Sequence, residues 1–211
     1  MKYEHIIWDF NGTILDDVET GIMSVNKLLR DRGLPEIQSK DHYRRIFRFP
    51  IKEYYQSLGF DFSKEPYEVI APLWVEQYME NVKTAKMFDD VEYALAFFRE
   101  KGIKQTVLSA TEESMLKMQL EDLGIIGYFD EVLGLDNIHA SSKQRLATEW
   151  RNRHPKEKAV MLGDTDHDFE VARSMDVECA LICRGHQSKE YLLSFSSNIY
   201  HDILQFCLDM N

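Results

Sequence analysis

The chain has 211 residues, of which 44% are hydrophobic, and its formal net charge is −11. This composition is typical of a globular protein, either one domain with a sizeable core or a core domain that carries a smaller insertion. The negative charge argues against nucleic acid as a partner, because binding the phosphate backbone requires a basic surface. A locally positive pocket on such a protein can still bind a small anion.

The cysteines and the hydropathy pattern indicate the cellular compartment in which the protein is expected. Cys179, Cys183 and Cys207 are an odd, sparse set that predicts no disulfide framework, and no second Cys/His pair is spaced to complete a zinc site. No signal peptide is recognised before the first predicted strand, and no apolar run approaches the roughly 20 residues of a membrane span. We therefore expect a cytoplasmic protein without a membrane partner.

The N-terminal part of the chain predicts one strand followed by a long helical block. Residues 5–10 contain two β-branched residues and a Trp that run into Asp9, and they predict a buried strand that ends in a turn. Apolar residues then repeat at helical spacing from Val18 to Leu29, and Gly33 is placed to end that helix. A second apolar stripe, over 69–78, predicts another helix whose aromatic residues pack in a core. No strand is predicted between residues 16 and 85.

From residue 88 onward, predicted helices alternate with short apolar strands. Helices are expected over 91–98, 116–123, 144–151, 169–175 and 201–207, and strands over 104–110, 128–133, 158–164 and 177–183. Such alternation indicates βαβ units and a mostly parallel sheet of the α/β class. Seams between domains are expected near residues 16–17 and 83–88.

Three predicted strands end in functional groups, namely Asp9, Ser109 and Asp164, and Lys143 follows a possible helix cap. Ligands of parallel sheets bind beyond the carboxyl ends of the strands, so we expect these side chains to meet at one edge. With Asp168, four residues after Asp164, up to three carboxylates share the crevice and favour a hard cation such as Mg²⁺. A hydroxyl and an ammonium beside them suit a phosphoryl group, and the remaining carboxylate can act as a nucleophile.

Each of these residues has a simpler structural explanation when it is taken alone. Asp168 could be a helix cap and Lys143 a surface lysine. The prediction of a phosphoryl site depends on these residues occurring together, in order, at the ends of predicted strands. Gly12 and Thr13, in the turn after the first strand, are expected to add backbone N–H donors for phosphate oxygens.

Four motifs give the set a family resemblance. "DFNGT" (9–13), "VLSA" (107–110), "SSK" (141–143) and "GDTDHD" (163–168) occur in that order along the chain. They resemble the four motifs of the haloacid dehalogenase-like hydrolases, in the phosphoglycolate-phosphatase-like branch with a helical cap. The resemblance implies an α/β fold, with a Rossmann-like, mostly parallel sheet core over 1–16 and 85–211. It also implies an inserted all-helical cap over 17–84.

The resemblance also implies roles for individual residues. Asp9 would be the nucleophile, and Ser109 and Lys143 would hold the phosphoryl oxygens. Mg²⁺ would be bound by Asp9, Asp164 and the backbone carbonyl of Asn11, with Asp168 supporting the metal's surroundings or Lys143. Ala110, beside Ser109, would join Gly12 and Thr13 in binding the substrate.

The sequence departs from the family pattern at Asn11, where an Asp usually protonates the leaving oxygen and later activates water. An amide can donate a hydrogen bond but cannot exchange a proton at neutral pH. The assistance that would be lost is typically 10²–10⁴-fold in rate. Asn11 therefore favours substrates whose leaving group departs readily as an anion. His139 and His167 flank the third and fourth motifs and are alternative proton handlers.

A cluster of arginines in the helical block, Arg44, Arg45 and Arg48, is either a solvated helix face or a substrate contact. In the second case, Arg45 or Arg48 would bind a distal anionic group of the substrate, since the guanidinium fork matches carboxylate and phosphate.

The sequence thus predicts a Mg²⁺-dependent phosphatase for a small phosphorylated metabolite, phosphoglycolate-like, that acts through an aspartyl phosphate as a monomer or homodimer. Two alternatives stay open. One is a protein that retains Mg²⁺ and phosphoanion binding but has lost useful turnover, which Asn11 favours. The other is phosphotransfer to a second hydroxyl, against which Asn11 counts.

Overall fold

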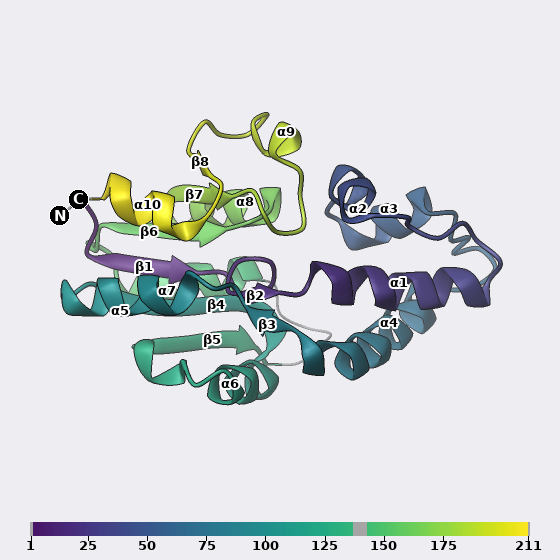
Figure 1. Ribbon diagram of the computed structural model, residues 1–211, viewed down its shortest axis with the longest axis horizontal. Coiled ribbons are helices and arrows are strands. Elements are labelled where there is room, and N and C mark those ends of the chain that lie inside the picture. The colour runs from purple at the N-terminus through teal and green to yellow at the C-terminus, as the bar shows by residue number, and fades with distance from the viewer. Residues whose placement is uncertain (1, 137–142, 211) are drawn as a thin grey trace.

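The computed structural model describes residues 2–136 and 143–210, and is built around a parallel sheet (Figure 1). The sheet has six strands in the order β5-β4-β1-β6-β7-β8, and every neighbouring pair is parallel. The strands are β1 His5–Trp8, β4 Lys104–Glu112, β5 Glu131–Leu135, β6 Ala159–Gly163, β7 Glu178–Ile182 and β8 Ile199–Tyr200. The predicted α/β class and mostly parallel sheet are confirmed.

Helices cover both faces of the sheet. Helices α5 (Val91–Glu100), α6 (Glu113–Asp122) and α10 (Ile203–Asp209) pack on one face, and α7 (Lys143–Arg153) and α8 (Asp166–Ser174) on the other. Successive strand residues point to opposite faces, so Trp8 packs in the first cluster with Phe98 while Ile7 packs in the second with Trp150. Burial on both faces explains the continuous apolar runs of the strands.

A second group of helices stands beyond the carboxyl edge of the sheet, and we call it the helical lobe (Figure 1). It consists of α1 (Val18–Asp31), α2 (Lys40–Ile46), α3 (Ile51–Ser57) and α4 (Tyr67–Asn81), followed by the 3₁₀ turn η1 (Val82–Thr84). The lobe has its own hydrophobic cluster, in which Val18, Val25 and Leu29 of α1 pack with Tyr55 and Ile70. The helical spacing predicted for α1 is confirmed.

The stripe predicted on α4 packs differently from the expectation. Ile70 is buried, but Val69 and Leu73 are exposed. The helix packs on α1, and Trp74 and Tyr78 are partly buried at the edges of the hydrophobic clusters while they also line a cavity. A stripe read from the sequence therefore joins one core position, two exposed positions and two cavity positions.

A small antiparallel ribbon joins the lobe to the sheet. Strands β2 (Leu15–Asp16) and β3 (Lys86–Met87) pair Leu15 with Met87 and Asp16 with Lys86. The chain thus leaves for the lobe and returns from it at the same place. Neither strand was predicted, nor were β8 and α9 (Lys189–Leu192), because elements of two to four residues carry no readable period.

Some boundaries also differ from the prediction. Helix α8 begins at Asp166 rather than at residue 169, because Thr165 caps it through a capping box with Asp168. Strand β5 covers 131–135 where 128–133 was predicted. Among the described helices, none combines the length and the apolar character that crossing a bilayer requires.

Candidate active site

A cavity of about 300 Å³ lies between the carboxyl edge of the sheet and the helical lobe. Asp9 follows β1, Ser109 lies in β4, and Asp164 follows β6; all three line this cavity. Lys143, the first residue of α7, and Asp168 in α8 reach the same place. The structure thus brings together the five side chains that the motifs singled out.

The carboxylates of Asp9, Asp164 and Asp168 form a tight, buried cluster. Each offers an oxygen atom within 4.8 Å of the others. The ammonium group of Lys143 makes ion pairs with Asp9 and, at 2.6 Å, with Asp168 Oδ1. Lys143 is only 4% exposed, so it is a buried member of the site and not a surface lysine.

The cluster carries more negative than positive charge. Burial raises the pKa of the Asp9 carboxyl to about 7, with the Asp168 charge adding to the rise and Lys143 opposing it. Burial also raises the pKa of Asp164 well above its usual range. Burial alone would lower the pKa of Lys143, but the charges of Asp168 and Asp9 outweigh it and raise that pKa. An oxygen-rich, underneutralised site of this kind fits a hard divalent cation such as Mg²⁺.

The carboxylates of Asp164 and Asp168 differ in their hydrogen-bond partners. Asp168 Oδ1 binds Lys143, and Oδ2 accepts from the backbone N–H of Thr165 at 3.0 Å and from its hydroxyl at 2.7 Å. Asp168 is therefore engaged in positioning Lys143 and in capping α8, which leaves it poorly placed as a direct metal ligand. Asp164 Oδ2 accepts from His186 N–H at 2.5 Å, whereas Oδ1 has no hydrogen-bond donor among the described residues.

The backbone N–H groups of the turn after β1 donate hydrogen bonds to acceptors in and next to the turn. Gly12 N–H donates to Asp17 Oδ1 at 2.8 Å and to the Leu15 carbonyl at 2.9 Å, and Thr13 N–H points to the Phe10 carbonyl. These N–H groups are not available for phosphate in this structure, contrary to the expectation for Gly12 and Thr13. Gly12 has φ +75°, and a Cβ there would lie 2.3 Å from Asp164 Oδ2. The glycine therefore allows the turn to approach the carboxylate cluster.

Asn11 is held by three neighbours. Its Nδ2 donates to Asp17 Oδ2 at 2.9 Å and to the Tyr78 hydroxyl at 2.7 Å, and its Oδ1 accepts from Thr111 at 3.0 Å. Because a carboxylate only accepts hydrogen bonds, the amide nitrogen must face Asp17. Thr111 also contacts the Ser109 hydroxyl at 3.1 Å, so Asn11 and Ser109 belong to one network.

Asp17 is the most important residue that the sequence reasoning missed. It is 1% exposed and accepts from Asn11, Gly12 and Tyr78, the last at 2.6 Å. His186 Nε2 lies 3.1 Å from Asp17 Oδ1, and its Nδ1 lies 2.9 Å from the Tyr43 hydroxyl. Burial would lower the pKa of His186, but the Asp17 charge raises it to about 9. The signal in the sequence was a second acid directly after "TILD", which was interpreted only as a domain seam.

Comparisons with known proteins place this site in a family. The profile of the haloacid dehalogenase-like hydrolases matches residues 6–182. The chain belongs to that family. It is 27% identical to a phosphoglycolate phosphatase of Aquifex aeolicus, over 92% of this chain and 93% of the relative.

Two solved structures share the fold of this chain. A family hydrolase from Streptococcus pneumoniae superposes with a TM-score of 0.82 at 19% identity, covering 100% of this chain and 99% of that chain. The Protein Tyrosine Kinase A of Mycobacterium tuberculosis has a TM-score of 0.74 at 21% identity, covering 89% and 87% respectively. The resemblance inferred from the four motifs is confirmed.

In this haloacid dehalogenase-like hydrolase, the arginine cluster lies outside the cavity. Arg44 donates to the carbonyls of Gly185 and Arg184 and so ties α2 to the loop after β7. Arg48 stacks on the Tyr191 ring at 3.3 Å, and Arg45 is exposed. Neither Arg45 nor Arg48 lines the cavity in this structure, where the prediction placed one of them against a distal anionic group of the substrate.

The remaining predicted residues take different places. Ala110 lines the cavity beside Ser109, and His167 lines it with its ring stacked on Phe49 at 4.8 Å. Burial lowers the pKa of His167. His139 lies outside the described residues.

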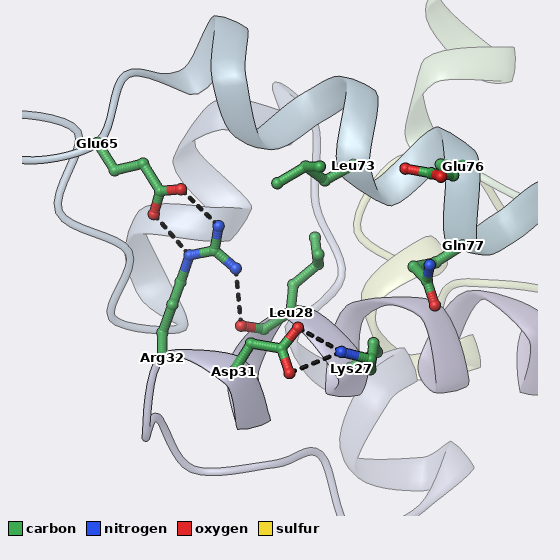
Figure 2. A pocket seen from close by; sticks show the side chains of 8 residues that line it. All are labelled: Lys27, Leu28, Asp31, Arg32, Glu65, Leu73, Glu76 and Gln77. Carbon is green, nitrogen blue, oxygen red and sulfur yellow. Dashed lines mark hydrogen bonds and ion pairs between the residues drawn. The ribbon is translucent and has the colours of Figure 1, made fainter.

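Two other groups of polar side chains lie away from this cavity, and several of their charged groups form ion pairs with one another. At the opposite edge of the sheet, His5, His154 and Glu157 could hold a metal, but Glu157 also pairs with Lys104 at 2.6 Å. A second hollow, of about 380 Å³, lies between α1 and α4. Figure 2 shows that four of its charged groups form two ion pairs, Arg32 with Glu65 and Lys27 with Asp31. The Lys27 and Asp31 side chains of this second hollow are exposed, unlike the buried pair of Lys143 and Asp9.

Proposed function

We propose that this protein is a Mg²⁺-dependent phosphatase that hydrolyses a small phosphorylated metabolite through an aspartyl phosphate. The observation that carries the proposal is the position of Asp9. Its carboxylate lies at the carboxyl end of the central strand, is paired with the buried Lys143, and shares a cluster with Asp164. The relatives named phosphoglycolate phosphatase support the same reaction type.

The side chains divide the reaction between them. Asp9 attacks the phosphorus atom, and the bond from phosphorus to the leaving oxygen breaks. Lys143 and the Ser109 hydroxyl hold the phosphoryl oxygens as charge shifts among them, and Asp168 keeps Lys143 in place. Water then hydrolyses the aspartyl phosphate, which releases phosphate and regenerates Asp9. Mg²⁺, held by Asp9, Asp164 and the Asn11 carbonyl, would supply countercharge to the phosphoryl group.

We further propose that residues 17–84 serve as the cap of this core. The lobe supplies the wall of the cavity opposite the carboxylate cluster, with α1, α2, α3 and α4 all contributing residues. Closing this wall excludes bulk water and strengthens the electrostatic interactions inside. Arg44 and the Tyr43–His186 contact hold the lobe against the loop that follows β7.

A second candidate function is favoured by Asn11. Its side-chain amide cannot exchange protons, and both polar atoms of that amide are engaged with Asp17, Tyr78 and Thr111. A protein of this kind could bind Mg²⁺ and a phosphoanion without useful turnover.

Turnover of p-nitrophenyl phosphate distinguishes the two candidates. We expect phosphate release that requires Mg²⁺, is lost on adding EDTA, and returns when Mg²⁺ is restored. The Asp9→Asn variant is the control for contaminating phosphatases. Mg²⁺-independent release, or wild-type release no greater than that of the control variant, would exclude the phosphatase and leave the binding function.

A further inference from the structure

The lobe side of the cavity is unusually rich in aromatic side chains. Seven aromatic residues of α2, α3, α4 and their connections line it, among them Tyr43, Phe47, Tyr54, Trp74 and Tyr78. Several contact one another, such as Trp74 and Tyr78, whose ring centroids lie 4.9 Å apart at 23°. The volume of about 300 Å³ is at the small end of the range of roughly 300–1,000 Å³ for small-molecule sites. The occupant is therefore a small molecule that presents an apolar surface to these rings.

In the described part of the chain, the lining of this cavity provides no unpaired, strongly basic side chain for a distal anionic group. Among the described residues that line it, the strongly basic side chain is Lys143, which is paired with Asp9 and Asp168. His186 is paired with Asp17, whose carboxylate would repel an anion placed there. A substrate with a second carboxylate, such as phosphoglycolate, would leave that charge desolvated and unpaired, which is costly.

The phosphoryl end of the cavity restricts the leaving group of the substrate independently of the aromatic lining. Asn11 cannot protonate the leaving oxygen, so the leaving group must depart as an anion. A phenol has a pKa of about 10, several units below the value of about 15.7 for water, which represents an unactivated hydroxyl. A phenolate therefore leaves with little protonation, whereas an alkoxide does not.

Resting on the proposed phosphatase function, we propose that the substrates of this site are aryl phosphate monoesters without a second anionic group. The aryl ring lies among Tyr43, Phe47 and Trp74, and the phosphoryl group lies at Asp9. In the first step a bond forms between Asp9 and phosphorus, and the electron pair of the broken P–O bond leaves on the phenolate, which takes a proton from water. In the second step water hydrolyses the aspartyl phosphate. The products are a phenol and inorganic phosphate.

A matched series of four substrates tests the proposal in the presence of Mg²⁺. Phenyl phosphate has the ring and the good leaving group; benzyl phosphate keeps the ring but leaves as an alkoxide; 4-carboxyphenyl phosphate adds a distal anion; phosphoglycolate has the anion without the ring. We expect kcat/KM for phenyl phosphate to be about a hundredfold higher than kcat/KM for phosphoglycolate. It should be about tenfold higher than kcat/KM for benzyl phosphate or for 4-carboxyphenyl phosphate. Equal or higher kcat/KM for phosphoglycolate would overturn the proposal.

Two variants on α4 test where the aryl ring of the substrate binds. Trp74→Leu should lower the ratio of kcat/KM for phenyl phosphate to that for acetyl phosphate, which has no ring, by about tenfold. Leu73→Ala is the control, because Leu73 is the adjacent residue but lines the second hollow (Figure 2). An unchanged ratio in Trp74→Leu would mean that the ring does not lie against α4, and would refute this placement.

Ligand binding separates failure of this proposal from failure of the phosphatase function. If no substrate is hydrolysed, calorimetry with phenylphosphonate and phosphonoacetate in Mg²⁺ still tests the cavity. Tighter binding of phenylphosphonate would support the aryl site in a protein without turnover. Equal or tighter binding of phosphonoacetate would refute the aryl site, whatever the turnover.

Discussion

Exchanging the carboxylate and the amide between positions 11 and 17 should show whether Asn11 limits the reaction. In the structure, Asn11 Nδ2 donates to Asp17 Oδ2 at 2.9 Å. The single change Asn11→Asp would replace this hydrogen bond by two facing carboxylates. The double change Asn11→Asp/Asp17→Asn would keep one carboxylate and one amide in contact, with their positions exchanged.

The electrostatic cost of the single change follows from this contact, because the charge centres of two facing carboxylates would lie about 4 Å apart. Two unit charges about 4 Å apart repel by about 4 kcal/mol at an effective dielectric constant of about 20. This energy corresponds to about 3 pKa units, so one carboxyl of the pair would keep its proton to about pH 7 in the folded state, against about 3.9 in the unfolded state. A raised folded-state pKa of an acid means that the folded state binds more protons, so the free energy of unfolding falls as the pH rises between these values.

Thermal unfolding and kinetics together provide the assay. At pH 8 we expect Asn11→Asp to melt about 8–16 °C below wild type, whereas at pH 4–5 the difference should be small. The double variant should melt near wild type at both pH values. It should also raise kcat/KM for benzyl phosphate about tenfold or more, because a carboxyl now stands beside the leaving oxygen, and it should help phenyl phosphate less.

Two results would refute this reasoning. A melting difference for Asn11→Asp that does not grow with pH would mean that Asp17 does not face position 11 as an anion. A double variant that folds normally and gains nothing on benzyl phosphate would mean that another group already handles the proton, and His167, which lines the cavity, would be the next to replace.

Three other changes test the carboxylate cluster and its surroundings. Asp9→Asn should abolish phosphate release in a folded protein, and residual activity within tenfold of wild type would contradict a covalent mechanism. Lys143→Met should lower the free energy of unfolding by about 3–5 kcal/mol at neutral pH, because two buried carboxylates lose their countercharge; denaturant titration at pH 5 and pH 8 should show a smaller loss at the lower pH. The His186–Asp17 pair raises the pKa of His186 to about 9, so its contribution to stability is complete below about pH 6.5 and is lost as the pH rises through 9. This slope, measured by urea unfolding in EDTA, should disappear in His186→Gln, and its persistence would assign the slope to another group.

The parallel sheet could be predicted because its inner strands β1, β4, β6 and β7 have long buried runs that read as continuous apolar segments. The same logic placed Asp9, Ser109 and Asp164 at one edge, since parallel strands present their carboxyl ends together. Lys143 was assigned by the order of the motifs and not by its own surroundings. The sequence around it could not show that the residue is buried between two carboxylates.

The lobe side of the site could not be predicted in the same way. Trp74 and Tyr78 have the helical spacing of a core stripe, and only the packing of α4 on α1 shows that they face a cavity. His186 and Asp17 are 169 positions apart, so their contact depends on how the lobe meets the loop after β7. The roles expected for Arg45 and Arg48 depended on a helix orientation that local sequence does not determine.

The β2–β3 ribbon has a consequence for how such a protein can diversify. Because Leu15 pairs with Met87 and Asp16 with Lys86, the two ends of the helical insertion are neighbours in space. A different insertion with equally close ends could be grafted at this point without changing the order of the sheet strands or the positions of Asp9, Ser109 and Asp164. Descendants of one ancestral core could thus acquire new substrate selectivity by replacing the lobe, while the reacting groups stayed under separate selection.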